Sequence, residues 1–560
     1  MKSHYRRYIL IFIVGGAMAV FTSLITNKNL RRHTDAAIKT ENYRQEGFSR
    51  LGKRDIYVEA MLGDASYLNP ILATDSASGA VNALVYNGLV KYDKNLILVG
   101  DLAEKWEVKD GGRTIIFHLR KNVRWHDGKP FTARDVIFTY KKLTDPGTKT
   151  PYASDYLLIK SIEAADPFTV VVRYKKPFAP ALESWGIGII PEHIYSDGQP
   201  DINSHPANRS PVGTGPFRFA GWITDEKIIL EANDDYFEGP PGIGRVIFRI
   251  VPDQSVQFLE LRNQSIDSMS LTPDQWNAYD VFFRKYNKFR YPAFQYTYLG
   301  FNLARHPFDD ARIRRAIAYA IDKSQIINGV LLDIGRPATG PYPPQSWAYN
   351  HEVSDYEYDP KKARQILEEA GWGDSDGDGI LDKKSSDGKK INFEFTILTN
   401  QGNKVRQMTA EIIQSQLKKA GIKTNVRIIE WSSFIHQFID KKNFDAVILG
   451  WSLSRDPDQY SIWHSSEARE GGYNFVSYKN PEVDKLLDMG RETFDFASRQ
   501  KIYRRIHRII HQDAPYIFLY YPDSLSVVHK RFKGPEIAPA GIGWNFREWY
   551  VPPSEIKYKY

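Results

Sequence analysis

One short polar stretch has the residue types and spacing of a cation site. It carries carboxylates at near-alternate positions: Asp374, Asp376, Asp378 and Asp382. In calcium loops oxygen ligands recur at this spacing, a glycine stands at the sixth position and a backbone carbonyl serves at the seventh. Gly379 and Ile380 occupy those two positions, but the twelfth is Ser385 and not a bidentate Glu. Two interpretations stay open: a structural calcium loop and a solvated acidic turn.

The sequence lacks the motifs of several other chemistries. It has no Cys, which excludes disulfides, thiolate metal sites, a cysteine nucleophile and a lipid-anchored lipoprotein. The 13 His residues form no metal-ligand pattern, and H-E-x-x-H, G-x-S-x-G and Walker A motifs are absent. We therefore expect no required cofactor. If ATP drives a process involving this chain, the ATPase is another protein.

The segment Asp101–Leu143 has a clear pattern of predicted strands and a helix. Thr114–Leu119 is β-branched and aromatic and predicts a strand, and a second strand follows through Val123. Thr132 stands three residues before Asp135, which predicts a capping box at the start of a helix. This segment therefore predicts a β-β-α unit.

Helices and strands alternate in the second half of the chain, which implies βαβ units. The predicted strands are 56–58 (as an edge strand), 168–172, 393–398, 426–430, 444–449, 517–521 and 526–528. The predicted helices are 81–89, one that follows an Asp cap in Asp309-Asp310, one capped by Asp359, 408–420 and 499–511.

Length and charge bound the class of protein. A chain of 560 residues is too long for one ordinary core, so two or three packed units are expected. Residues 1–54 hold eleven Lys/Arg and three Asp/Glu, whereas the remaining residues hold 64 of each sign. The formal charge of +8 therefore comes from the N-terminal arm. A body without net charge does not favour nucleic-acid binding.

The N-terminal arm has the features of a targeting segment. The apolar run Ile9–Ile25 follows a basic leader and contains Ala17-Met18-Ala19, a cleavage pattern. Within 1–26, a cleaved signal peptide and an uncleaved membrane anchor are both open, and 27–54 is interpreted as a basic tether. Either alternative predicts a periplasmic body, soluble after cleavage or tethered to the inner membrane by residues 9–25.

Several motifs resemble one known family. The matching segments include Ala103-Glu104-Lys105-Trp106, Val123-Arg124-Trp125-His126-Asp127-Gly128, Phe131-Thr132-Ala133-Arg134-Asp135-Val136 and Pro211-Val212-Gly213-Thr214-Gly215-Pro216-Phe217. From about residue 55 onward, the chain resembles the extracellular solute-binding proteins of family 5, the peptide/nickel-type (cluster C) receptors of ABC importers. The resemblance implies an α/β, two-lobed periplasmic binding protein type II fold with an extra subdomain in the first lobe.

In such a fold the ligand binds between lobes that close by a hinge motion. We expect lobe I at 55–300, lobe II at 301–515 and a return to lobe I at 516–560.

The resemblance also implies a ligand site. It indicates the run Gly450–Asp458 at the end of an apolar strand, where open α/β sheets bind ligands. Peptide receptors of the family place an amine-pairing Asp in this run, whereas Leu453 and Ser454 stand there in this chain. Asp456 aligns better with a structural Asp-Pro. The expected ligand-binding residues are Tyr86, Thr214, Gly215, Asn302, Gln401, Trp451, Ser452, Asp456 and Trp463.

The sequence therefore predicts a monomeric receptor that delivers a solute to an ABC permease and its separate ATPase. Peptides are the expected cargo. The missing amine-pairing Asp keeps an oligosaccharide, an opine-like compound or a metal chelate open as alternatives. A secreted hydrolase with paired carboxylates is a third hypothesis, which no motif supports.

Overall fold

The computed structural model describes residues 54–198, 201–278, 281–385 and 387–558. The predicted signal or anchor segment and nearly all of the tether lie outside these residues. The chain divides into two units, Met1–Asp55 with Pro553–Tyr560 and Ile56–Pro552. The fold described below is that of Ile56–Pro552.

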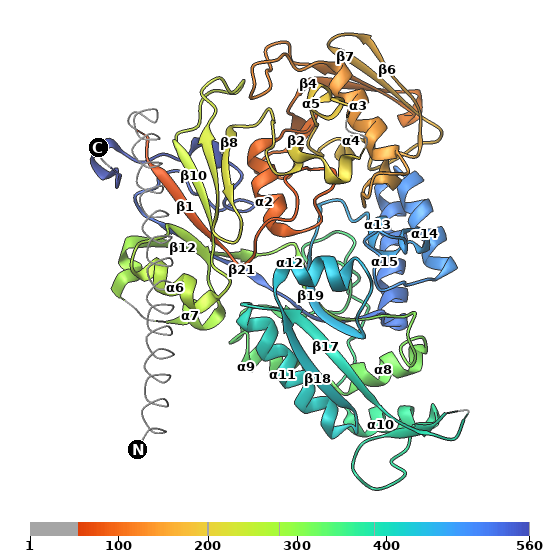
Figure 1. Ribbon diagram of the computed structural model, residues 1–560. Helices are drawn as coiled ribbons and strands as arrows, with labels where there is room; N and C mark the ends of the chain where they lie inside the picture. Colours follow the sequence, from red (N-terminus) through yellow and green to blue (C-terminus); the bar gives the residue numbers. More distant parts are fainter. Residues whose placement is uncertain (1–53, 199–200, 279–280, 386, 559–560) are drawn as a thin grey trace, which may run out of the picture. The chain divides into compact units, whose positions relative to one another are not determined.

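The first of two large sheets in this unit has seven strands (Figure 1). Its order is β12 (Tyr286–Pro292), β21 (Asp523–His529), β11 (Ser268–Ser270), β1 (Ile56–Met61), β10 (Arg245–Ile250), β9 (Lys227–Ala232) and β8 (Phe217–Ile223). The prediction that 56–58 is an edge strand was wrong, because β1 pairs in parallel with both β10 and β11. Tyr57 of β1 is buried against the rings of Phe532 and Trp549.

The second large sheet has six strands. Its order is β14 (Arg336–Pro337), β20 (Tyr516–Tyr521), β13 (Gln295–Phe301), β19 (Ala446–Ser452), β17 (Glu394–Asn400) and β18 (Lys423–Ile429). Its central strands are buried on both faces. Leu299 of β13 and Ile448 of β19 belong to one hydrophobic cluster, and their sequence neighbours Tyr298 and Leu449 belong to another. This is what alternation of side chains along a strand produces when both faces are covered.

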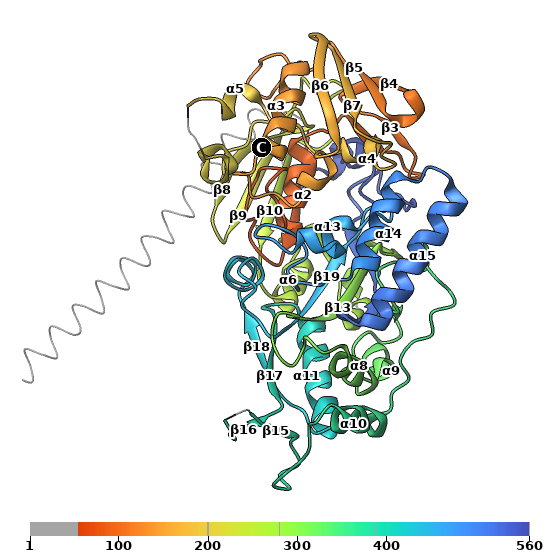
Figure 2. The ribbon, with the colours of Figure 1, turned by 90° about the vertical axis from the view of Figure 1, so that its right-hand side faces the viewer.

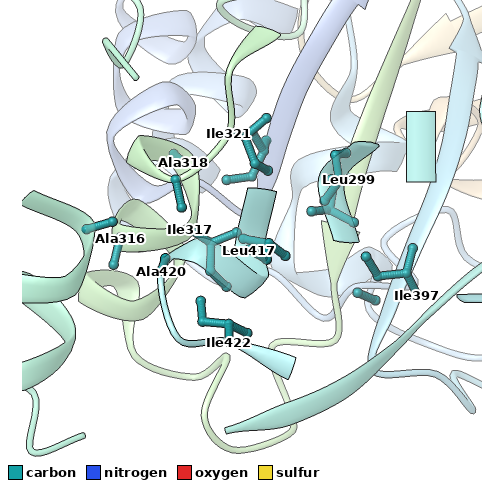
Figure 3. Close-up of a cluster of buried hydrophobic side chains, with 14 of the residues drawn as sticks. Leu299, Ala316, Ile317, Ala318, Ile321, Ile397, Leu417, Ala420 and Ile422 are labelled. Atoms are coloured by element: carbon teal, nitrogen blue, oxygen red, sulfur yellow. The ribbon is translucent and has the colours of Figure 1, made fainter. Parts of the chain in front are cut away.

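Helices α8 (Ala311–Tyr319) and α11 (Lys404–Lys419) cover one face of the six-stranded sheet. Ile317 of α8 and Leu417 of α11 are fully buried there with Ile397 of β17 (Figure 3). Each helix begins at a capping side chain: Asp310 accepts from the N–H of Arg312, and Asn403 accepts from the N–H of Arg406. Such caps satisfy backbone donors that have no partner within the helix.

The other face of the six-stranded sheet packs against α15 (Phe496–Asp513) and its neighbour α14 (Pro481–Glu492), which run side by side (Figure 2). A four-stranded sheet, β4 (Ala103–Lys109), β5 (Thr114–Leu119), β7 (Thr169–Tyr174) and β6 (Ile159–Asp166), carries α3 (Ala133–Thr144). Thr132 and Asp135 form the predicted capping box of α3.

The remaining elements connect these layers. The short strands are β2 (Val90–Tyr92), β3 (Leu98–Gly100), β15 (Asp382–Lys384) and β16 (Lys390–Asn392). The remaining helices are α2 (Ser76–Val85), α4 (Ala181–Ser184), α5 (Glu192–Tyr195), α6 (Gln254–Arg262), α7 (Pro273–Asn277), α9 (Lys323–Gly329), α10 (Pro360–Glu369), α12 (Trp431–Ser433) and α13 (Tyr460–Trp463). Helix α2 starts before the predicted 81–89, because the Asp75 carboxylate caps it at Ser78.

The chain crosses between the two large sheets at two adjacent points. The first crossing joins β12 to β13 at Ala293, and the second joins β20 to β21 at Pro522. The backbone N–H of Ala293 donates to the carbonyl of Pro522 at 3.3 Å. The predicted strand 517–521 therefore belongs to the six-stranded sheet and 526–528 to the seven-stranded one. The lobe boundaries stay a prediction. Among the described residues, no helix has the length and apolarity needed to cross a membrane.

Candidate functional site

A large cavity, of about 2170 Å³, is lined by residues of both large sheets and of the helices and loops next to them. On one side it is lined by Asn82 of α2 and by Tyr86, which follows this helix, and on the other by Tyr296 of β13 and Trp451 of β19. Pockets for drug-sized ligands measure roughly 300–1,000 Å³. This cavity therefore has room for a ligand considerably larger than a single metabolite.

Aromatic side chains join the two sides of the cavity. Trp451 packs edge-on against Tyr473, with ring centroids 5.0 Å apart, and its Nε1 donates to the Tyr516 hydroxyl at 3.3 Å. The hydroxyls of Tyr473 and Tyr152 lie 3.1 Å apart, and Tyr152 also donates to the carbonyl of Ala73. Burial raises the pKa of both phenols, so they remain neutral donors. Rigid aromatic walls offer large contact areas at low entropic cost.

The structure brings four of the predicted ligand-binding residues to this cavity: Tyr86, Trp451, Ser452 and Asp456. Tyr86 is almost fully buried and donates to the carbonyl of Leu68 at 3.3 Å. Ser452 ends β19 and accepts from Gln295 at 3.1 Å. The Asp456 carboxylate accepts from the N–H of Asp458 and pairs with Arg499 at 2.7 Å, so its charge is already matched.

The other predicted residues lie behind the wall or outside it. Thr214 is buried and donates to Asn87 at 3.2 Å, and Trp463 is fully buried with its Nε1 bonded to Gln459. The amide of Asn302 donates to the carbonyls of Lys442 and Phe444, which fixes a turn. The Gln401 side chain is exposed.

Glycines in the segment Gly213–Gly215 permit a close approach of two backbones. A Cβ on Gly213 would lie 1.8 Å from the carbonyl oxygen of Val85, and one on Gly215 would lie 2.4 Å from that of Leu84. His126 bridges the two glycines: its Nδ1 accepts from the Gly213 N–H at 3.1 Å, and its Nε2 donates to the Gly215 carbonyl at 3.0 Å. These contacts fix the C-terminal end of α2 in the cavity wall.

The acidic stretch folds into a tight loop, and the ammonium group of Lys390 lies beside its carboxylates. Carboxylate oxygens of Asp374, Asp376 and Asp382 all lie within 4.8 Å of one another. Lys390 contacts Asp376, and its Nζ lies 3.6 Å from Asp382 Oδ2. This ammonium holds the pKa of Asp376 below its usual value. Two further predicted ligands belong to the same loop: Asp378 accepts from the N–H of Ile380 at 2.8 Å.

Sequence reasoning missed several residues of the cavity. Tyr152 and Tyr473 meet although 321 positions separate them, which no local pattern indicates. Arg406 lies in the first turn of α11, ahead of the predicted helix start at 408. The Asn403 cap was the available signal for that first turn.

Two large sheets with a ligand-sized cavity between them define the class of two-lobed binding proteins. The family model of bacterial extracellular solute-binding proteins, family 5 (middle region), matches residues 98–472. The chain belongs to this family, as its motifs predict, and it is therefore a solute-binding protein and not an enzyme. The type II periplasmic binding protein fold is likewise confirmed.

Three comparisons describe the relatives. The oligopeptide-binding protein AppA of Bacillus subtilis (strain 168) is 37% identical over 506 residues, which cover 88% of this chain and 91% of that protein. A structure of AppA from Bacillus subtilis with a nonapeptide has a TM-score of 0.85 at 36% identity, covering 89% and 99% of the two chains. NikZ from Campylobacter jejuni in complex with Ni(L-His) has a TM-score of 0.78 at 29% identity, with the same coverage.

Proposed function

We propose that this protein is the substrate-binding component of an ABC importer and that its cargo is peptides. The observation that carries the proposal is the cavity of about 2170 Å³ with aromatic and hydrogen-bonding walls. An extended peptide presents both apolar side chains and backbone amides, and such walls can satisfy both. The similarity to a relative solved with a nonapeptide supports the same cargo.

The partners and location follow from the family. The receptor would deliver its cargo as a monomer to a membrane permease, whose ATPase is a separate chain. We place the body in the periplasm, either released after signal cleavage or tethered by residues 9–25. Within the cavity, Tyr86, Trp451, Ser452 and Asp456 would contact or border the cargo. Thr214, Gly215, Asn302, Gln401 and Trp463 would shape the surrounding structure.

A non-peptide cargo is the second candidate, and a specific observation favours it. The two carboxylates of the loop after β19 are not available to a cargo amine, since Arg499 engages Asp456 and Arg491 engages Asp458. NikZ shows that a protein similar to this chain is found with a metal chelate. A metal chelate, an opine-like compound or an oligosaccharide would need no amine-pairing group.

Mass spectrometry of co-purified cargo tests the proposal directly. The protein is purified from its own periplasm, weighed under native conditions and then denatured to release what it carries. A series of short peptides is the expected result. One non-peptide compound would overturn the peptide cargo and leave the receptor function intact.

We also propose a weak structural calcium ion in the acidic loop. Asp374, Asp376, Asp378 and Asp382 would contribute carboxylates and Ile380 its carbonyl. The mutual approach of three of these carboxylates supports the proposal. The ion would replace the Lys390 ammonium and stabilise the loop without touching the cargo.

A further inference from the structure

Arg406 presents an unmatched guanidinium to the cavity. It lies in the first turn of α11, immediately after the Asn403 cap, and lines the cavity beside Gly450. Its Nη1 donates to the Asn400 side chain at 2.9 Å. A Cβ on Gly450 would lie 3.1 Å from its Nη2, so the glycine leaves space beside the guanidinium.

Other groups around Arg406 do not neutralise it. In the part of the chain that the structure describes, no carboxylate forms an ion pair with Arg406, and the side chain that it contacts, Asn400, is neutral. Burial lowers its pKa, yet a guanidinium remains protonated in proteins. Arg406 is half-buried, and a partly desolvated cation without a carboxylate partner is unfavourable until an anion reaches it.

Three carboxylates of the cavity wall are, by contrast, already paired with arginines. Asp155 and Asp458 share Arg491 at 2.6 and 2.8 Å. Asp456 pairs with Arg499 at 2.7 Å. Of the three arginines Arg406, Arg491 and Arg499, Arg406 is therefore the one without a carboxylate partner.

Two other acids of the wall, Asp75 and Glu183, have no cation paired with them in the described residues. The Asp75 carboxylate is engaged as the cap of α2, where it accepts from the N–H and the hydroxyl of Ser78 at 2.9 and 2.6 Å. Burial, together with the nearby Asp456, raises the pKa of Glu183 to about 7, and Tyr92 donates a hydrogen bond to it. It therefore carries a reduced negative charge near neutral pH and is a weak partner for a cargo amine.

We propose that Arg406 is the fixed anchor of the cargo and that it binds a carboxylate. Asn400 holds one end of the guanidinium, so Nε and Nη2 remain to donate in parallel to the two oxygens of a carboxylate. This inference rests on the proposed peptide cargo and adds which charged group of the cargo the receptor binds. The receptor would hold its ligand by an acid and not by an amine. The acid is the peptide C-terminus or an acidic side chain.

Titration calorimetry with three peptide pools tests the anchor. The first pool contains peptides of two to nine residues without Asp or Glu and with free C-termini. The second contains the same peptides as C-terminal amides. The third contains amidated peptides with one Glu each. All three are titrated into the wild-type protein, Arg406→Gln, Arg406→Lys and the control Lys404→Gln, which changes an exposed cation of the same helix.

The two sources of the carboxylate give different results. If it is the C-terminus, amidation weakens wild-type binding about 30-fold or more, whereas Arg406→Gln binds the free and amidated pools equally weakly. If it is a side chain, the third pool binds tightly and loses the same factor in Arg406→Gln. Arg406→Lys keeps the charge but loses the parallel donors, so its binding is intermediate. Lys404→Gln matches the wild type.

Two results would overturn the inference in distinguishable ways. Peptides that bind equally well with and without a carboxylate, and equally well to Arg406→Gln, would leave the peptide cargo standing and refute the anchor. A wild-type protein that binds none of the pools would refute the peptide cargo itself, and the anchor with it. Circular dichroism of Arg406→Gln verifies that the variant is folded.

Discussion

Arg491 and Asp155 form a buried ion pair, with Nη2 and Oδ1 2.6 Å apart, although 336 positions separate them in the sequence. The same guanidinium pairs with Asp458, and the carbonyl of Arg491 accepts from the N–H of Ala179 at 2.6 Å. Replacing Arg491 by Leu leaves two buried carboxylates without a cation. We expect a loss of about 3–5 kcal/mol in the free energy of unfolding, measured by urea denaturation.

The control for this change is an exposed pair. Arg505 pairs with Glu482 on the surface, so Arg505→Gln is expected to cost less than about 1 kcal/mol. Equal losses in the two variants would show that the buried pair has no special role in stability.

His126 makes stability depend on pH. Its Nδ1 accepts a hydrogen bond, so the native state requires the neutral ring, and burial lowers its pKa to about 4. An unfolded His titrates near pH 6.5, so the unfolded state binds more protons below that pH. Stability is therefore lost as the pH falls from about 6.5 towards 4. Between pH 7 and 4.5 this residue accounts for roughly 2 kcal/mol.

Urea denaturation at those two pH values measures the effect. His126→Gln is expected to be less stable than the wild type at pH 7 and to lose less on acidification. His507, whose pKa burial lowers to about 3, contributes to both proteins and cancels in the comparison. An unchanged acid dependence in His126→Gln would contradict the assignment.

Gly213 is expected to tolerate no side chain. Since a Cβ there would lie 1.8 Å from the Val85 carbonyl, Gly213→Ala must displace the end of α2, at about 3 kcal/mol or more. Thermal unfolding compares it with Gly373→Ala, at a position where a Cβ meets nothing within 4 Å. A Gly213→Ala variant as stable as the control would mean that the two backbones separate easily.

Trp451 is expected to carry a large share of the binding energy. It is rigidly held between Tyr473 and the Tyr516 hydroxyl, and aromatic residues in such positions dominate binding surfaces. Trp451→Ala should weaken peptide binding about 30-fold, by titration calorimetry with the co-purified peptides. Tyr358→Ala, an exposed aromatic outside the cavity, should bind normally. Similar affinities for both variants would remove Trp451 from the site.

The acidic loop should bind calcium weakly, because Lys390 already occupies the carboxylates. Loops of this kind span dissociation constants up to about 10⁻³ M, and we expect this one at the weak end. Lys390→Ala should tighten calcium binding, and Asp376→Asn should abolish it in the same calorimetric titration. Failure of Lys390→Ala to bind calcium would identify the stretch as a solvated acidic turn.

Features set by neighbouring residues could be predicted from the sequence. The capping box of Thr132 and Asp135 and the cap at Asp310 both form, because a cap needs only a side chain and the backbone of the next turn. The family motifs likewise predicted the fold class, since they cover most of the chain.

Features set by distant residues could not be predicted. The polar residues Asn403 and Lys404 do not show the apolar pattern of a helix, so the start of α11 was predicted too late. Arg406 in its first turn was therefore not included in the predicted site. Strand β1 was predicted at an edge because its own sequence does not reveal that β10 and β11 flank it. The pairing of Asp456 with Arg499 likewise depends on a helix 43 positions away.

The two adjacent crossings at Ala293 and Pro522 have a consequence for protein engineering. The chain leaves the seven-stranded sheet at Ala293 and returns to it at Pro522, and a 3.3 Å hydrogen bond joins these two points. A segment whose ends meet in this way can be removed and replaced as one cassette, because domain insertions succeed where chain ends lie close together. Chimeras between relatives could therefore be spliced at these two positions, which would exchange half of a binding surface with only two junctions.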